Sequence, residues 1–213
     1  MTDQAHGDTP IRRPDGPPAG VLALIVLVFT IASVVAYAAG SAFWTGFFAF
    51  AASIPLGIYA ATIYARQLRL GIRVPGPGIS FFGGISASVM LGVSGLLGWA
   101  QSRVDGLSPA VSRLVREVAF VLGGVGFVCG LGLLIAGIAV PAVILRLVPR
   151  WLAWAGLVLG ALGEIAFLAL LWDGLDVLLP IVRFLGLAWL AAMGFLLPRN
   201  RHDVERRTPR ASR

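Results

Sequence analysis

Six long apolar stretches alternate with short polar segments along the chain. They cover residues 21–40, 43–64, 79–100, 118–145, 151–172 and 177–197. About 20 helical residues cross a hydrocarbon core of about 30 Å, so each stretch is long enough to span a bilayer. The pattern predicts an all-α fold, a polytopic transmembrane bundle of six helices that forms one domain over residues 20–197.

Two polar tails flank this domain. Residues 1–19 are rich in Pro and Gly, and residues 198–213 are rich in Arg. Neither tail has enough apolar surface to offset the entropy of ordering, so we expect both to be disordered and cytoplasmic. The first apolar stretch has an alternative interpretation as a signal peptide, because Ala36-Tyr37-Ala38 resembles a cleavage site. Its apolar run exceeds the roughly 7 to 15 residues usual for such a signal, which favours a retained helix.

The fourth stretch is longer than a bilayer requires. Ser108-Pro109 has the form of an N-cap followed by proline at the first helical position. The pattern predicts a helix from about 109 to about 145, whose first turns lie at the outer membrane surface.

Composition excludes a soluble domain and indicates an orientation. Hydrophobic residues make up 58% of the chain, charged residues 13%, and the mean hydropathy is +0.88. Every basic residue is Arg, which together with abundant Ala, Gly and Val is typical of a GC-rich bacterial genome and favours the bacterial cytoplasmic membrane. With both termini inside, the arginines fall mostly on the inner side: Arg12, Arg13, Arg66, Arg69, Arg73, Arg146, Arg150 and six from Arg199 to Arg213. The outer side holds only Arg103, Arg113 and Arg116, so the positive-inside rule predicts an N-in, C-in topology.

Small residues recur at four-residue spacing inside the spans and predict close helix packing. The glycines that we expect at helix interfaces are Gly57, Gly84, Gly92, Gly126, Gly130, Gly156 and Gly160. In an alternative interpretation some of these glycines line a solute path, with Pro55 and Pro141 marking kinks at a gate.

Two charged residues lie inside the last two spans. If these spans form an antiparallel hairpin about Gly174, Glu164 and Arg183 reach the same depth, about 14 Å at about 1.5 Å per residue. Charges inside a bilayer are costly and mark functional sites, so the sequence predicts a buried ion pair or a solute or proton site there. In the alternative, Arg183 extends outward toward Asp173 or Asp176 and never meets the glutamate.

Arg116 and Glu117 precede the core of the fourth span, in its outer part. They are either charges at an outer mouth above the predicted pair or solvated interfacial charges, and we favour the second interpretation.

Enzymatic motifs are weak. Gly92-Val93-Ser94-Gly95 is similar to the serine motif of rhomboid intramembrane proteases, which need a histidine base on a later helix. The only histidines, His6 and His202, lie in the tails. Cys129 has no acidic or histidine neighbour in sequence and is interpreted as a packing residue. Metal-ligand spacing and a phosphate-binding loop are both missing, so the sequence predicts no catalytic residues, no metal or cofactor, and no nucleic-acid partner.

The segment Arg146-Leu147-Val148-Pro149-Arg150-Trp151 resembles one in the bacterial six-helix integral-membrane family filed as domain of unknown function four-three-eight-six. The family-like motif is Pro149, Arg150 and Trp151, which opens the fifth helix. The resemblance implies six membrane helices over roughly residues 20–197 and brings no established activity. Many members of that family carry Arg and Glu in the third helix and an acidic residue in the sixth. Here Gly83, Gly84, Ser86 and Ser88 occupy the third helix, and Arg183 lies in the sixth.

Three function classes follow. The first is a non-catalytic membrane scaffold or regulatory partner, whose tail from 198 to 213 contacts anionic lipid headgroups and which binds a membrane or cytosolic protein. The second is a small-solute or proton-coupled transporter that uses Glu164 and Arg183. The third, an enzyme acting on lipid, lacks a visible nucleophile or base. A clear inverted repeat, frequent in transporters, is missing from the sequence.

Overall fold

The computed structural model describes residues 17–198, and this part of the chain is helical and contains no strand. Six helices in it are long and apolar enough to cross a membrane, which confirms the predicted fold class. Large apolar side chains remain exposed on the outside of the spans, for example Val35, Phe82 and Leu185, as expected for a surface that faces lipid. Our predictions for the two tails lie largely outside the described residues.

The first three spans are single helices, α1 (Ala19–Ala38), α2 (Ala42–Arg69) and α3 (Gly76–Gln101). The fourth span joins α4 (Pro109–Val121), the π turn η1 (Leu122–Gly126) and α5 (Phe127–Ile144). The fifth span is α6 (Arg150–Ile165), which continues as the 3₁₀ helix η2 (Ala166–Leu170). A short 3₁₀ turn, η3 (Asp173–Leu175), then leads to the sixth span, α7 (Leu178–Leu196).

The long fourth span begins where the sequence predicts. Ser108 is its N-cap and accepts a hydrogen bond from the backbone N–H of Val111 at 3.4 Å, and Pro109 is the first helical residue. The span continues for 36 residues to Ile144. The sequence does not predict the π turn inside it. Three of the five residues of this turn are glycine, and π turns are rare overall but frequent at functional sites.

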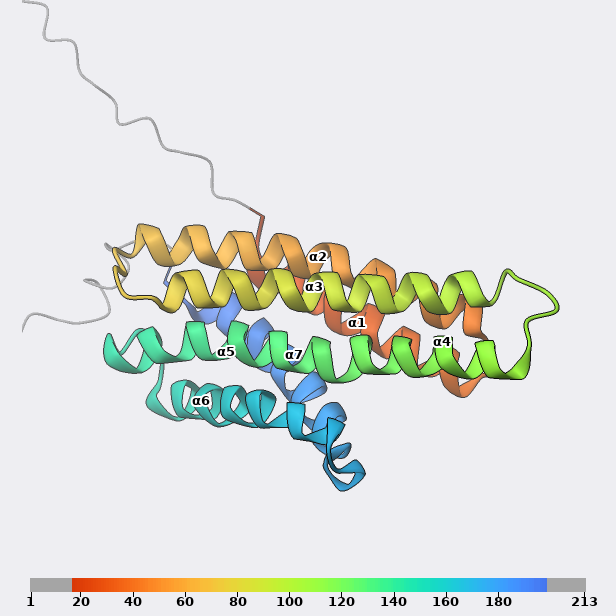
Figure 1. The fold of residues 1–213 in the computed structure, drawn as a ribbon. Helices are drawn as coiled ribbons and strands as arrows, with labels where there is room; N and C mark the ends of the chain where they lie inside the picture. Colours follow the sequence, from red (N-terminus) through yellow and green to blue (C-terminus); the bar gives the residue numbers. More distant parts are fainter. Residues whose placement is uncertain (1–16, 199–213) are drawn as a thin grey trace, which may run out of the picture.

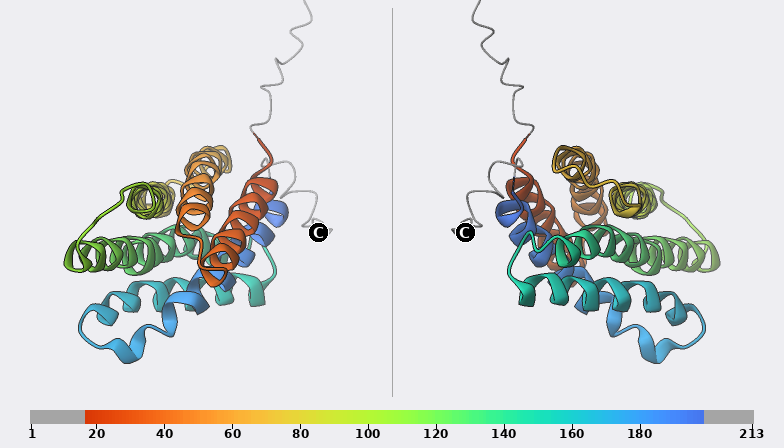
Figure 2. Two further views of the ribbon diagram at one scale, coloured as in Figure 1. Left: turned by 90° about the vertical axis from the view of Figure 1, so that its right-hand side faces the viewer. Right: turned by 90° about the vertical axis from the view of Figure 1, so that its left-hand side faces the viewer.

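Four spans lie in a row, and two cross behind it (Figure 1). Helices α2, α3, α5 and α6 lie side by side in that order. Helices α1 and α7 cross behind them and pack against each other, as the end views show (Figure 2). Helix α6 packs mainly against α5, and α7 mainly against α1, so these two consecutive helices share only a small contact. The predicted hairpin of the last two spans is therefore splayed.

Each glycine that the sequence assigns to packing lies against a neighbouring helix. The neighbours are Ser88 for Gly57, Ala60 for Gly84, Ser53 for Gly92, Met90 for Gly126, Ala87 for Gly130, Trp189 for Gly156 and Ala136 for Gly160. Elsewhere glycines of different helices meet backbone to backbone, for example Gly46 with Gly95 and Gly20 with Gly194. A Cβ built on Gly46 would lie 2.5 Å from the carbonyl oxygen of Gly95, and one on Gly194 would lie 2.6 Å from the Cα of Gly20. These contacts bring the helix axes close and hold the bundle together by dispersion.

Three helices end with the same hydrogen-bonded loop, a Schellman motif, in which one residue has a positive φ. Gly40 (φ +75°) ends α1, and Gly71 (φ +74°) ends α2. At the end of α5 the same position holds Arg146, at φ +51°, and Leu147 N–H donates to the Ala142 carbonyl to close the motif. A side chain in this conformation costs about 1 to 2 kcal/mol relative to glycine, so this arginine occupies a place where the fold alone favours glycine.

One end of the bundle, which we call the arginine end, carries the α2–α3 turn and the α5–α6 linker. Its exposed basic residues are Arg69, Arg73, Arg146 and Arg150. Within residues 17–198 this end has no acidic residue, because Asp105, Glu117, Asp173 and Asp176 are at the other end and Glu164 lies between.

The orientation predicted from sequence places the arginine end in the cytoplasm. Single cysteines at exposed positions Arg69 and Arg73, in a Cys129→Ala background, should stay unlabelled by an impermeant maleimide added outside intact cells. Cysteines at Asp105 and Asp176 should be labelled. Labelling of the first pair of cysteines, with protection of the second pair, would show that the topology is the reverse of the predicted one.

Candidate functional site

Three polar side chains of α2 are buried on the face that meets the other spans. Tyr59, Arg66 and Gln67 are 0%, 5% and 1% exposed. Their spacing of about seven to eight residues places them on one side of the helix. Each donates a hydrogen bond to a backbone carbonyl of another helix: Tyr59 to Leu190 at 2.9 Å, Arg66 to Gly194 at 2.9 Å and Gln67 to Gly137 at 3.0 Å.

The Gln67 bond compensates for a proline in α5. In an α-helix the carbonyl of Gly137 would accept from the N–H of residue 141, but Pro141 has no N–H. Gln67 Nε2 supplies the missing donor from α2, and Ser80 of α3 in turn donates to Gln67 Oε1 at 2.8 Å. A freed carbonyl inside a bilayer has no water to bond, so a neighbouring helix must satisfy it. Gln67 thus joins α2, α3 and α5 around one proline.

Arg66 has a similar role at the end of α7. The partner that Gly194 would have in a continued helix is residue 198, which is again proline, Pro198. Arg66 Nη1 donates to this carbonyl, and a positive charge at a helix C-terminus also interacts favourably with the helix dipole. The positive-inside rule counts Arg66 among the cytoplasmic charges, but its side chain is buried within the bundle.

Glu164 lies near the end of α6 with its carboxyl group against α5. A Cβ on Gly132 would lie 3.0 Å from Glu164 Oε1, so the glycine makes room for the carboxylate. Oε1 is buried and has no hydrogen-bond partner. An unpartnered carboxyl oxygen at this depth is energetically unfavourable.

Arg183 of α7 reaches the π turn in the fourth span. Its Nη2 donates to the carbonyl of Gly123, and its guanidinium carbon lies 5.0 Å from the ring centroid of Phe127. Cation–π contact with a desolvated guanidinium is favourable. The Nε atom of Arg183 is buried without a hydrogen-bond partner.

The structure does not join Glu164 and Arg183 in an ion pair, in contrast to the sequence expectation. Both side chains face the fourth span, but the arginine meets it at Gly123 and Phe127, and the glutamate meets it at Gly132. About five to nine helical residues separate these contacts, or about 7 to 14 Å along the axis. The equal depth predicted from sequence requires a straight hairpin in which the last two spans face each other. In the structure α6 continues as a 3₁₀ helix, and α7 packs mainly on α1.

The other residues discussed from the sequence lie at the surface or in helix contacts. Arg116 and Glu117 are exposed on α4, consistent with interfacial charges. Ser94 donates to the Ala119 carbonyl at 2.7 Å and so joins α3 to α4, while Cys129 is half-buried.

The family-like motif opens α6. Pro149 precedes the helix, Arg150 begins it, and Trp151 is exposed. Among the described residues no group of three His, Cys, Asp or Glu side chains is placed to hold a metal ion.

Sequence reasoning missed the α2 polar residues as a group. The sequence does contain a signal for them. Arg66 and Gln67 are polar residues near the end of an apolar stretch, and the prolines at 141 and 198 each leave a helical carbonyl that needs a donor from elsewhere. Which carbonyl each side chain meets depends on how the helices are paired, and helix pairing is not encoded in hydropathy.

The six long apolar helices of residues 17–198 place the protein in the class of polytopic α-helical integral membrane proteins. Comparison with known proteins narrows this class no further: no family model, no curated protein and no solved structure matches the chain.

Proposed function

We propose that the protein is a non-catalytic scaffold or regulatory partner in the bacterial cytoplasmic membrane. The observation that supports this proposal most strongly is the use of its buried polar side chains. Tyr59, Arg66 and Gln67 all bond to backbone carbonyls of neighbouring helices. Such bonds fix the helices relative to one another, which is the role expected of buried polar groups in a scaffold.

Glycine contacts support the same conclusion. A Cβ on Gly132 would lie 3.0 Å from the Cα of Gly163, so α5 and α6 meet through backbone, as do α1 and α7 at Gly20 and Gly194. Transport by alternating access requires one group of helices to move against another. Here such movement would separate close backbone contacts and leave the bonded carbonyls without a partner inside the bilayer. These contacts therefore favour a protein that keeps a single conformation.

The test is a flux measurement on purified protein in proteoliposomes that contain a pH-sensitive dye. Under imposed proton and anion gradients we expect no flux above that of protein-free liposomes. The variant Glu164→Gln should change stability alone. A flux that Glu164→Gln abolishes, while the variant stays folded, would contradict the scaffold proposal.

A second candidate function is proton-coupled or small-anion transport, favoured by one specific observation. Glu164 Oε1 and Arg183 Nε are buried without hydrogen-bond partners, and their side chains meet the same helical span at separate positions. Unsatisfied ionisable groups in a membrane span mark ion pathways. In this proposal Glu164 exchanges a proton and Arg183 attracts an anion, and the flux experiment decides between the two functions.

A further inference from the structure

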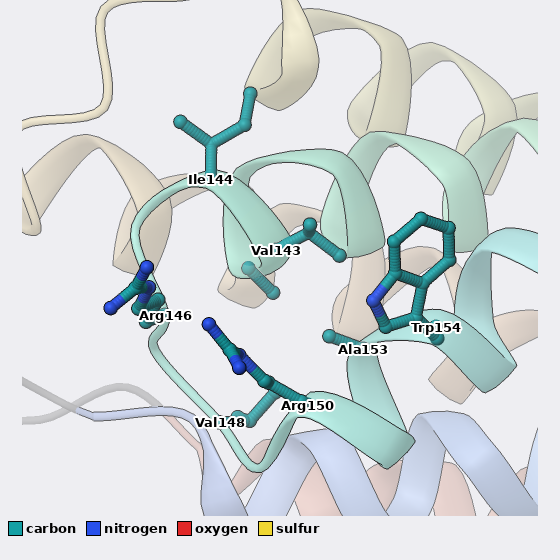
Figure 3. A pocket seen from close by; sticks show the side chains of 8 residues that line it. Val143, Ile144, Arg146, Val148, Arg150, Ala153 and Trp154 are labelled. Atoms are coloured by element: carbon teal, nitrogen blue, oxygen red, sulfur yellow. The ribbon is translucent and has the colours of Figure 1, made fainter.

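A cavity of about 410 Å³ lies between the end of α5 and the start of α6, at the arginine end of the bundle. Figure 3 shows Arg146 from the linker and Arg150 from the start of α6 beside it, with Val143, Ala153 and Trp154 along its apolar side. The cavity therefore combines two guanidinium groups with an apolar wall.

The positive charge of this cavity is not neutralised within the described residues. No acidic residue occurs in the chain between Glu117 and Glu164, and residues 17–198 place none at the arginine end. In the same part of the chain neither Arg146 nor Arg150 forms an ion pair, and both side chains are exposed. Two adjacent unpaired arginines attract an anion and offer the planar donor geometry that fits phosphate oxygens.

The backbone supports a role for Arg146 beyond folding. Its positive φ is the conformation for which the other two Schellman ends, at Gly40 and Gly71, use glycine. Non-glycine residues in this conformation are strained and concentrate at functional sites. Arg146 thus occupies a position at which the backbone conformation favours glycine over any residue with a side chain.

The surroundings select a lipid rather than a soluble anion. Trp154 is 59% exposed and Trp151 70% exposed, and tryptophan gathers at the level of lipid headgroups. Val143 and Ala153 complete the apolar wall beside Trp154. Basic pockets between membrane helices on the cytoplasmic side are known to take anionic headgroups.

We propose that this cavity binds the phosphate of an anionic glycerophospholipid, with Arg146 and Arg150 as its ligands. An acyl chain then extends past Val143 and Trp154 into the bilayer. This proposal is independent of whether the bundle is a scaffold or a transporter, because it concerns the surface of the linker and not the interior.

Native mass spectrometry of the purified full chain tests the proposal. The protein is incubated with equal amounts of phosphatidylglycerol and phosphatidylcholine, and retained lipids are counted. We expect the wild type to retain the anionic lipid at least about fivefold more, since each basic contact with an anionic headgroup contributes about 1 kcal/mol. Arg146→Gly combined with Arg150→Gln should remove most of this preference.

Matched variants exclude trivial causes. Arg146→Gly introduces the residue that the same motif uses at Gly40 and Gly71, so it keeps the fold, and a thermal melt checks this. Arg73→Gln removes an exposed charge from the same end outside the cavity and should leave the preference unchanged. An unchanged preference in the double variant, or an equal loss in Arg73→Gln, would overturn the proposal. Release of the lipid by millimolar glycerol phosphate would overturn it too, because the cavity would then be a site for soluble phosphate.

Discussion

Replacing Gly83 by alanine is expected to lower the free energy of unfolding by about 3 kcal/mol, the upper part of the range for overpacking a close contact. The added Cβ would lie 2.5 Å from the backbone nitrogen of Leu134 and 2.7 Å from the carbonyl oxygen of Gly130. Both atoms belong to the helical backbone of α5, so neither can rotate away as a side chain would. Helices α3 and α5 must separate to admit the methyl group.

Gly78 provides the matched control on the same helix. A Cβ at this position meets no atom within 4 Å, so Gly78→Ala should be neutral or stabilise α3 by up to about 1 kcal/mol through helix propensity. Both variants can be measured by unfolding in mixed detergent micelles with increasing denaturing detergent. Equal stability of the two variants would mean that α3 and α5 are not in backbone contact at Gly83.

The second expected result concerns the proline in α5. Gln67→Met keeps the approximate volume of the side chain but removes the donor to Gly137, and we expect a loss of about 2 kcal/mol because a buried carbonyl is left without a partner. In a Pro141→Ala background the helix regains its own N–H at position 141. The Gly137 carbonyl then needs no partner from α2, and Gln67→Met should cost much less.

A double-mutant cycle of these two substitutions isolates the effect. We expect a coupling energy of about 1 to 2 kcal/mol, with Gln67→Met less harmful when Pro141 is absent. Ser80→Ala provides the comparison, because it removes a donor to Gln67 and leaves Gly137 satisfied, so it should show little coupling to Pro141→Ala. Additive effects of Gln67→Met and Pro141→Ala would show that this glutamine does not replace the missing helical donor.

The features predicted correctly from sequence are local ones. Six spans follow from runs of apolar residues, because a bilayer demands a minimum length of helix. The start of the fourth span follows from Ser108 and Pro109, because an N-cap and a proline at the first position need only adjacent residues. The packing glycines lie at helix interfaces because close approach requires small side chains wherever helices meet.

What the sequence leaves open is the direction in which each side chain points and the helix that it meets. Glu164 and Arg183 can be placed at a common depth by counting residues, but counting does not reveal that α7 packs mainly on α1 or that α6 ends in a 3₁₀ helix. The π turn at Gly123 is equally hidden, although it presents the carbonyl that Arg183 binds. These features depend on the pairing of helices distant in sequence.

If the bundle holds one arrangement of its helices, the distance between two spin labels placed on different helices is the same in every condition. Labels on cysteines at Ser102 and Asp176, both exposed at the end opposite the arginine end, report movement of the α6–α7 connection relative to α3. In Cys129→Ala protein reconstituted in lipid nanodiscs, we expect a single distance population that is the same in mildly acidic and mildly alkaline buffer. Two populations whose ratio changes with pH, and no longer changes in Glu164→Gln, would mean that the bundle moves between two arrangements and that Glu164 controls the movement.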